Sequence, residues 1–262
     1  MEKYYRFEMT EMAAGRLKSS QEYQRSVSGK HVLEISKNFE WDIVTPIRVS
    51  ERGGVYYVFD GQHTLASIKS KYGDDVIVPV QLYRGLTYER EAELTAKLDR
   101  FRKKMKRIEV DNALLESGDN DREKFVSLCN DLGWNVAFNT RITNKQFYVQ
   151  NPSYVFEMVY MKHGAAYTGR FLNLFTNAFS GDCSAMRSPI QRGINLFMES
   201  YKDEYSDATL TRALRGKEPD IIIGNMKDDT KHTGDKRYAH TILLYYNKVT
   251  NKKLKSKFER GE

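Results

Sequence analysis

The chain has 262 residues, a length that allows one or two domains, and we expect two. Its 42 Lys and Arg residues against 35 Asp and Glu give a formal net charge of +7, an excess that favours polyanionic partners. Aromatic residues make up 12% of the chain and include 17 Tyr, which excludes a disordered tail and provides material for a hydrophobic core.

Neither the cysteines nor the hydropathy indicates a secreted or membrane protein. Cys129 and Cys183 lie in unrelated surroundings without a CxxC or paired-His pattern, so a disulfide framework or structural zinc site is not expected. We expect both to be half-buried residues in a reducing compartment. The charged first residues lack the apolar core of a signal peptide, and no segment approaches the ~20 apolar residues of a membrane span. We therefore expect a cytoplasmic protein with no membrane partner.

The first elements in chain order alternate between helix and strand. Ser28, followed by Val32, Ile35 and Phe39 at helical spacing, predicts a short amphipathic helix that ends before Trp41. Apolar runs at 46–49 and 55–59 flank a turn with two glycines, which predicts a β-hairpin.

The next elements are a helix, a strand and a second helix. Asp60-Gly61 breaks the hairpin's second strand, and the following helix ends before Gly73. Residues 76–82 predict a further strand, and Thr87 is the expected N-cap of the helix after it.

Beyond about residue 108 the apolar residues recur every three or four positions, which indicates helices. The expected helical stripes are Phe125, Leu128 and Leu132; Phe156, Val159 and Tyr160 after Asn151-Pro152; Leu172, Phe175 and Phe179; Ile194, Phe197 and Tyr201 after Ser188-Pro189; and Leu210 and Leu214 after Ser206. One segment, 227–237, is expected to be a loop. The sequence thus predicts an α+β protein, with a small mixed domain over residues 1–108 and an all-α domain over 109–262.

The strongest local signal for a binding site is the stretch Asp60-Gly61-Gln62-His63-Thr64, between a strand and a helix. A helix N-terminus presents unpaired N–H groups and partial positive charge, and Gly61 would let an anion approach the backbone. Gln62 and His63 add side-chain donors, and His63 can transfer a proton near neutral pH. Without further support, such a turn is most often only a turn.

Two other segments strengthen the prediction of an anion site. Tyr23-Gln24-Arg25 precedes the first helix, and residues 100–107 hold six basic side chains among eight: Arg100, Arg102, Lys103, Lys104, Lys106 and Arg107. A charge run is usually a solvated helix face. The position of this run beside the candidate phosphate-binding turn at residues 60–64 instead favours a groove for a nucleotide or nucleic acid.

The order of these motifs resembles the ParB/sulfiredoxin superfamily, and more narrowly the ParB-like proteins of phages and mobile elements. The resemblance covers residues 20–110 and is carried by Tyr23-Gln24-Arg25, Asn38-Phe39, Pro46-Ile47-Arg48-Val49, Tyr57-Val58-Phe59-Asp60-Gly61-Gln62-His63 and Val78-Pro79-Val80. It implies a small ParB/sulfiredoxin-like domain whose glycine turn holds the phosphates of CTP or ATP, with Mg²⁺.

Carried over residue by residue, the resemblance places Gly61, Gln62 and His63 on the phosphate turn, and Asp99 and Arg102 on the family's Asn-x-x-Arg motif. The sequence departs from the family at Thr64, where the family has Arg, and at Asp99, where it has Asn. Both changes weaken triphosphate binding unless a metal or nearby basic residues compensate. Gln62 stands where sulfiredoxin has its reactive cysteine, so that activity is not expected.

The remaining titratable residues favour structural roles. His163 and His240 lie on helical stripes as core or surface features, and His31 and His232 are expected to face solvent. Glu89, Glu91 and Glu93 diverge around a helix, so no metal site is expected there. Asp228 and Asp229 with His232 and Asp235 could chelate a divalent ion, but we prefer the interpretation that they lie in a mobile loop of acidic and basic residues.

Three functions remain open from the sequence. The first is a DNA-associated phage or mobile-element protein whose mixed domain binds a nucleotide or a nucleic-acid backbone, with Gln24, Arg25, Gly61, Gln62, His63, Thr64 and Arg102 as its ligand-binding set. The second is a ParB-like nuclease or phosphotransferase using His63, Asp60 and Asp99 around a divalent ion. The third is an inhibitor of a host nucleic-acid-handling defence complex. Expected partners are therefore nucleic acid or a nucleic-acid-handling protein complex, and a homodimer is compatible with all three.

Overall fold

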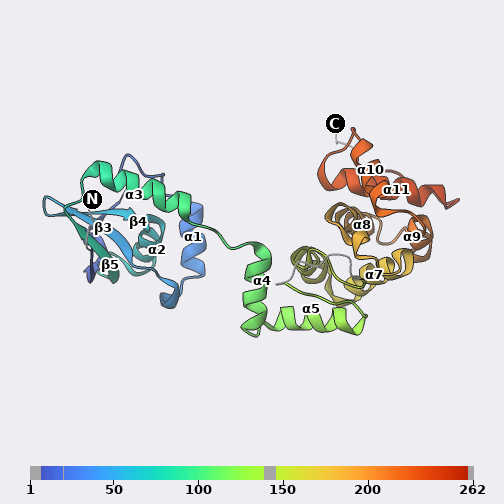
Figure 1. Ribbon diagram of the computed structural model, residues 1–262, viewed down its shortest axis with the longest axis horizontal. Coiled ribbons are helices and arrows are strands. Elements are labelled where there is room, and N and C mark those ends of the chain that lie inside the picture. Colours follow the sequence, from blue (N-terminus) through green and yellow to red (C-terminus); the bar gives the residue numbers. More distant parts are fainter. Residues whose placement is uncertain (1–6, 20, 139–145, 259–262) are drawn as a thin grey trace, which may run out of the picture. The chain divides into compact units, whose positions relative to one another are not determined.

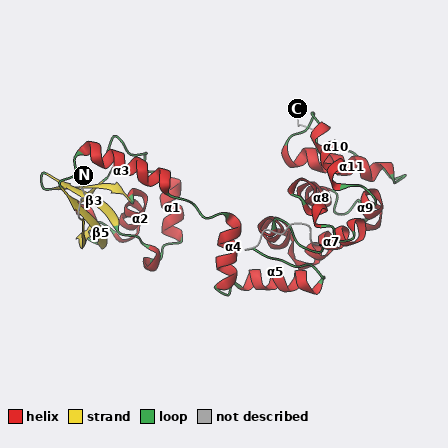
Figure 2. Cartoon of the chain, viewed as in Figure 1, coloured by secondary structure: helices red, strands yellow, loops and turns green. Residues whose placement is uncertain are grey.

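The structure is a computed structural model that describes residues 7–19, 21–138 and 146–258. The chain divides into two compact units, Met1–Lys104 and Met105–Glu262, which we call the mixed unit and the helical unit (Figure 1). Among the described residues the extended strands all belong to the mixed unit (Figure 2). The α+β class expected from the sequence is confirmed.

The mixed unit is built on a five-stranded sheet with the strand order β1-β5-β3-β4-β2. Its strands are β1 (Phe7–Ala13), β2 (Leu17–Lys18), β3 (Ile47–Arg52), β4 (Val55–Asp60) and β5 (Ile77–Arg84). Strands β1 and β5 pair antiparallel, as do β3 and β4, whereas β3 and β5 are parallel, as are β2 and β4. Its helices are α1 (Gly29–Lys37), α2 (Gln62–Tyr72) and α3 (Tyr88–Phe101), with 3₁₀ turns at Ala14–Arg16 and Trp41–Ile43.

Helices α2 and α3 cover opposite faces of the sheet. Successive side chains of a strand point to opposite faces. Val58 of β4 packs in one core with Leu65 and Ile68 of α2. Its neighbour Phe59 is also buried, and the Thr95 hydroxyl of α3 donates a hydrogen bond to the Phe59 carbonyl at 3.0 Å. The end of β4 is therefore held from both sides.

A buried carboxylate connects the sheet to α3 and to the segment before α1. Glu91 of α3 is fully buried, and its carboxylate accepts hydrogen bonds from Arg52 Nε at 2.6 Å and from the Tyr23 hydroxyl at 3.1 Å. The Arg52 guanidinium also lies 4.1 Å from the centre of the Tyr57 ring. Burial, and secondarily the nearby Glu91 charge, raise the pKa of Tyr23 well above its ordinary value, so Tyr23 stays a donor.

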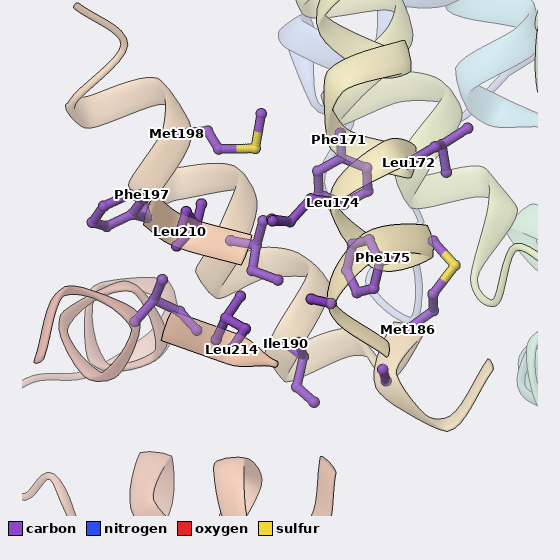
Figure 3. Close-up of a cluster of buried hydrophobic side chains, with 14 of the residues drawn as sticks. Phe171, Leu172, Leu174, Phe175, Met186, Ile190, Phe197, Met198, Leu210 and Leu214 are labelled. Carbon is purple, nitrogen blue, oxygen red and sulfur yellow. The ribbon is translucent and has the colours of Figure 1, made fainter. Parts of the chain in front are cut away.

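The helical unit has its own hydrophobic core. Its elements are α4 (Arg107–Glu116), α5 (Asn120–Asp131), α6 (Pro152–Tyr154), a π-helical segment (Val155–Met161), α7 (Lys162–Phe179), a 3₁₀ turn (Cys183–Met186), α8 (Ser188–Ser200), α9 (Asp207–Leu214), α10 (Pro219–Asp228) and α11 (Gly234–Lys248). Figure 3 shows side chains from α7, α8 and α9 meeting in this core. Helices α8 and α11 approach closely at Gly193, where an added Cβ would come within 2.9 Å of the Tyr238 backbone.

Most of the elements expected from the sequence are confirmed, including three N-caps. Ser28, Thr87 and Ser206 each accept a hydrogen bond from the backbone N–H three residues on. Strands β1 and β2 and helices α4 and α10 were not foreseen from the pattern, and α11 was foreseen only in the helical stripe that holds His240. Strand β1 alternates mostly exposed residues at a sheet edge, so it carries little hydrophobic signal.

Three expectations were wrong. The segment 227–237 is not a single loop, because α10 extends to Asp228 and α11 begins at Gly234. The packing of these two helices outweighs the polar composition of the segment. His232 does not face solvent; it is 7% exposed. Cys129 and Cys183 are fully buried and unpaired rather than half-buried, and burial raises the pKa of Cys129 to about 12.

The length and composition of the helices bear on the expectation that the chain contains no membrane-spanning segment. None of the helices that the structure describes combines the length and the apolar composition needed to cross a bilayer.

The ion pair between Arg52 and the buried Glu91 leads to a prediction about stability. Replacing Arg52 by Ala leaves the Glu91 carboxylate buried without its cation, so we expect the mixed unit to lose about 3 kcal/mol of unfolding free energy. Hydrogen exchange of the β3 and β4 amides measures this loss separately from the helical unit. The control is Lys97→Ala, on the same helix, whose ion pair with Glu93 is exposed and should not matter. Equal protection in both variants would contradict the prediction.

Candidate phosphate-binding site in the mixed unit

The turn between β4 and α2 leaves the first backbone N–H groups of α2 without acceptors among the described residues, and an anion site at a helix N-terminus would use such groups. Gly61 has φ of +92°, a left-handed conformation that residues with a side chain rarely adopt. Because glycine has no side chain, α2 begins without a side-chain cap. Within the described residues, no acceptor is found for the backbone N–H groups of Gln62, His63 and Thr64. These groups carry the partial positive charge of the helix N-terminus.

The first turn of α1 meets the first turn of α2 at His63. The backbone N–H of Ser28, the N-cap of α1, donates a hydrogen bond to His63 Nε2 at 3.2 Å. The ring of His31 lies edge-on to that of His63, with centroids 5.1 Å apart. Burial, followed by the proximity of His31 and Arg25, lowers the pKa of His63. His63 is therefore a neutral imidazole at pH 7 with its proton on Nδ1.

Arginine side chains surround this turn. Arg25 pairs with Asp99 at 2.9 Å, and Asp60 accepts from both Arg48 at 3.2 Å and Arg102 at 3.0 Å. Three guanidinium groups thus face two carboxylates beside the α2 N-terminus. The side chains of Arg25 and Arg102 are 80% and 62% exposed. Exposed ion pairs contribute little to stability, so a phosphate group can compete for both arginines.

The side-chain amides of Gln24 and Gln62 make different contacts. The Gln24 amide donates to the Val58 carbonyl at 2.6 Å and accepts from the Gln21 N–H at 3.0 Å, which attaches this segment to β4. The Gln62 amide donates to the Arg25 carbonyl at 2.9 Å. Its Oε1 atom is buried and has no hydrogen-bond partner among the described residues. This oxygen can accept a hydroxyl or amino hydrogen.

A cavity of about 370 Å³ opens beside Thr64, in the volume range of small-molecule pockets. Its walls come from α1 and the segment after it: His31, Glu34, Ile35, Asn38, Phe39, Glu40, Ile43 and Val44. The apolar members and the two glutamates suit an uncharged ring better than a phosphate.

The structure divides the basic run between the two units. Arg100, Lys103 and Lys104 are exposed at the end of the mixed unit. Lys106 and Arg107 belong to the helical unit, where Arg107 forms an ion pair with Glu157. The residues expected to be catalytic all have partners: Asp60 and Asp99 pair with arginines, and His63 Nε2 accepts from Ser28.

Sequence reasoning missed two residues of this site, Arg48 and Ser28. Arg48 lies in β3 between buried Ile47 and Val49, and its pairing with Asp60 depends on the register of β3 against β4. A charged residue alternating with apolar ones in a strand was the available signal. Ser28 was recognised as a cap, but its contact with His63 depends on how α1 packs against α2.

Comparisons with solved structures found ParB proteins. One is the C-terminally truncated chromosome-partitioning protein ParB from Caulobacter crescentus complexed with CTP-gamma-S: 11% identity, TM-score 0.36, covering 83% of this chain and 97% of that one. A second is a C2221 form of a Pnob8-like ParB-N domain: 14% identity, TM-score 0.32, covering 95% and 94%. A third is a pNOB8-like ParB N-domain: 11% identity, TM-score 0.33, covering 92% and 97%.

A comparison with curated proteins found no match. A model described as a family of unknown function, DUF6551, matches residues 19–258, and the chain therefore belongs to this family.

Proposed function

We propose that the mixed unit binds a nucleotide, with its phosphates at the start of α2 and its nucleoside in the cavity beside Thr64. The observation that carries this proposal is the meeting of two helix N-termini, those of α1 and α2, among three arginines. Two helix N-termini and one surplus guanidinium charge make this the part of the unit best suited to an anion.

The nucleoside part of the proposal rests on groups that a bare phosphate would not use. A phosphate oxygen accepts hydrogen bonds and cannot satisfy the buried Gln62 Oε1, whereas a ribose hydroxyl or a base amino group can. The cavity beside Thr64 has apolar walls at Ile35 and Phe39 that suit a planar ring. CTP or ATP with Mg²⁺, the ligands implied by the resemblance to ParB-like proteins, have both parts.

Binding is favoured over hydrolysis. A catalytic site built from His63, Asp60 and Asp99 needs carboxylates that are free to hold a metal ion and a base that is free to take a proton. Both carboxylates here are paired with arginines, and His63 Nε2 already accepts a hydrogen bond. The nuclease or phosphotransferase function is therefore the second candidate.

Calorimetric titration of the full chain with CTP, ATP and GTP, with and without Mg²⁺, tests the proposal. Arg25→Ala should weaken binding of the preferred nucleotide by about ten-fold, since a charge-assisted hydrogen bond contributes roughly 1.5–3 kcal/mol. The control is Arg84→Ala, another exposed, ion-paired arginine of the mixed unit. If no nucleotide binds, or if both variants bind equally, the proposal is wrong.

Restoring the arginine that ParB-like turns carry should strengthen binding. Thr64 offers one short hydroxyl donor, whereas an arginine can grip two phosphate oxygens, so Thr64→Arg should raise triphosphate affinity by about ten-fold or more. Ser70→Arg adds the same charge to an exposed position near the other end of α2 and should change little. The same titrations, together with phosphate release, check this. Brisk hydrolysis by the natural chain that depends on His63 and Asp99 would instead support the enzyme.

We further propose that the exposed lysines after α3 contact nucleic acid, as a DNA-associated protein of a phage or mobile element requires. The side chains of Lys103 and Lys104 are exposed and make no ion pair within the part of the chain that the structure describes. Arg102, in contrast, is held by Asp60. The same surface could serve an inhibitor that binds a nucleic-acid-handling complex, so the nature of the partner has to be tested directly.

A salt titration of DNA and RNA binding makes that test. Replacing Lys103 and Lys104 by Ala should weaken binding equally for all sequences and reduce the log–log salt slope by about 1.4–1.8, since each lost phosphate contact lowers it by about 0.7–0.9. The control replaces Lys202 and Lys227, two exposed lysines of the helical unit. An unchanged slope, or no binding by the parent protein at low salt, would exclude the nucleic-acid surface.

A further inference from the structure

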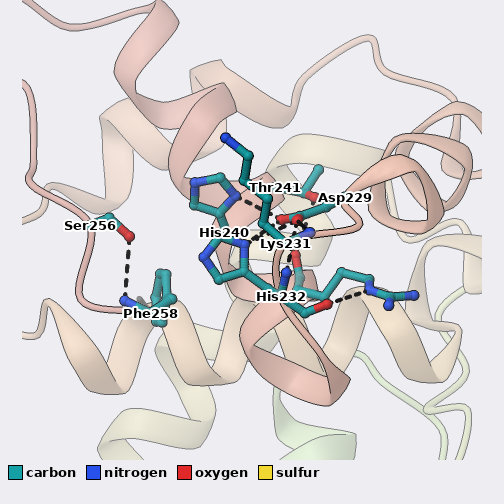
Figure 4. Close-up of polar contacts among 8 residues, drawn as sticks. Asp229, Lys231, His232, His240, Thr241, Ser256 and Phe258 are labelled. Carbon is teal, nitrogen blue, oxygen red and sulfur yellow. Dashed lines mark hydrogen bonds and ion pairs between the residues drawn. The ribbon is translucent and has the colours of Figure 1, made fainter. Parts of the chain in front are cut away.

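Two histidines and an aspartate converge in the helical unit, whereas the site described above belongs to the mixed unit. Asp229 follows α10, His232 lies in the connection to α11, and His240 lies within α11 (Figure 4). Asp229 Oδ2 lies 2.8 Å from the Nδ1 atom of each histidine, and the centroids of the two rings are 4.2 Å apart. Their side chains are only 10%, 7% and 20% exposed.

The surrounding backbone fixes the direction of the Asp229 carboxylate. Its Oδ1 atom accepts hydrogen bonds from the backbone N–H groups of Lys231 at 3.0 Å and His232 at 3.1 Å. The backbone carbonyl of His232 accepts from Arg237 Nε of α11 at 3.0 Å, which fixes the connection to that helix. Oδ1 is thus held by the backbone of the connection and also lies 3.0 Å from His232 Nδ1, whereas Oδ2 faces both imidazoles. Hydrogen bonds of this kind to a ligand's carboxylate orient it in metal sites.

We propose that Asp229, His232 and His240 bind one divalent transition-metal ion, of which zinc fits best, through Asp229 Oδ2 and the two Nδ1 atoms. One donor atom from each of the three residues lies within 4.8 Å of the others. Around tetrahedral zinc, with bonds of about 2.0–2.2 Å, donor atoms lie roughly 3.3–3.5 Å apart. The two 2.8 Å separations therefore have to open by about 0.5–0.7 Å to admit the ion.

The donor set decides the class of metal. Imidazole nitrogens suit zinc, copper, iron and nickel, whereas magnesium and calcium prefer all-oxygen sites. A ring that carries a proton on Nδ1 has to give it up there, for example by the shift to the Nε2–H tautomer, before Nδ1 can bind the metal. Three protein ligands leave a fourth tetrahedral position for water. The ion would connect the end of α10 to α11.

The alternative is a triad held by hydrogen bonds alone, in which both ring N–H groups donate to Asp229 Oδ2. This triad and a metal site have the same residues and burial, but they differ in whether the chain takes up a metal. A metal titration therefore separates them.

The experiment titrates the chelator-treated full chain with Zn²⁺ and, as a visible-light probe, with Co²⁺. We expect one saturable ion per chain and the intense absorption bands of tetrahedral Co²⁺. His240→Gln and Asp229→Asn should weaken zinc binding by roughly 100-fold or more, beyond the 10–100-fold cost of changing a residue that only hydrogen-bonds to a metal ligand. The matched control is His163→Gln, a half-buried histidine of α7 in the same unit, which should bind zinc like the parent.

Circular dichroism of the metal-free variants shows whether they keep their helices. If a variant fails to fold, the parent's stoichiometry and Co²⁺ spectrum decide alone. Absence of saturable binding by the parent, an octahedral Co²⁺ spectrum, or binding that survives in folded His240→Gln and Asp229→Asn would overturn the proposal.

Discussion

The buried carboxylate of Glu91 is the interaction on which the mixed unit's geometry depends. A fully buried charge is tolerated only when it is paired and hydrogen-bonded, and Glu91 obtains both partners from distant parts of the chain: Arg52 of β3 and Tyr23. The segment that contains Tyr23 is thereby fixed against α3. Because Arg25 and Ser28 follow within a few residues, this attachment determines where they meet the α2 N-terminus.

The Tyr23-Gln24-Arg25 motif therefore serves mainly to fix the position of its own segment in the mixed unit. Tyr23 bonds to Glu91, Gln24 bonds to the Val58 carbonyl, and only Arg25 presents an exposed charge. Two of the three side chains hold the segment in place so that the third can face the turn. The contacts of Gln24 position the segment that carries Arg25, which is how Gln24 contributes to the geometry of the proposed site.

The sequence predicted the mixed unit better than the site within it. Local signals such as the caps at Ser28 and Thr87 and the glycine turn at Gly61 reflect backbone preferences over a few residues, and such preferences can be read from the chain. The pairing of Arg48 with Asp60 depends on strand register, and that of Glu91 with Arg52 on how α3 packs against the sheet. Spacing showed that the carboxylates at 89, 91 and 93 diverge, but it could not show which of them is buried. His232 was misjudged for the same reason, since its burial comes from the packing of α11.

The acidic partners determine how strongly the proposed site can bind. A ligand phosphate does not meet free arginines, because Arg25 already holds Asp99 and Arg102 already holds Asp60. Binding exchanges one anion for another, so the gain is the difference between a charge-assisted phosphate contact and an exposed ion pair that contributes little. The displaced carboxylates would remain beside the ligand and repel it unless a cation lies between them. Mg²⁺ carried by a triphosphate would offset that repulsion, so affinity at this site should depend on the divalent ion more strongly than the number of arginines suggests.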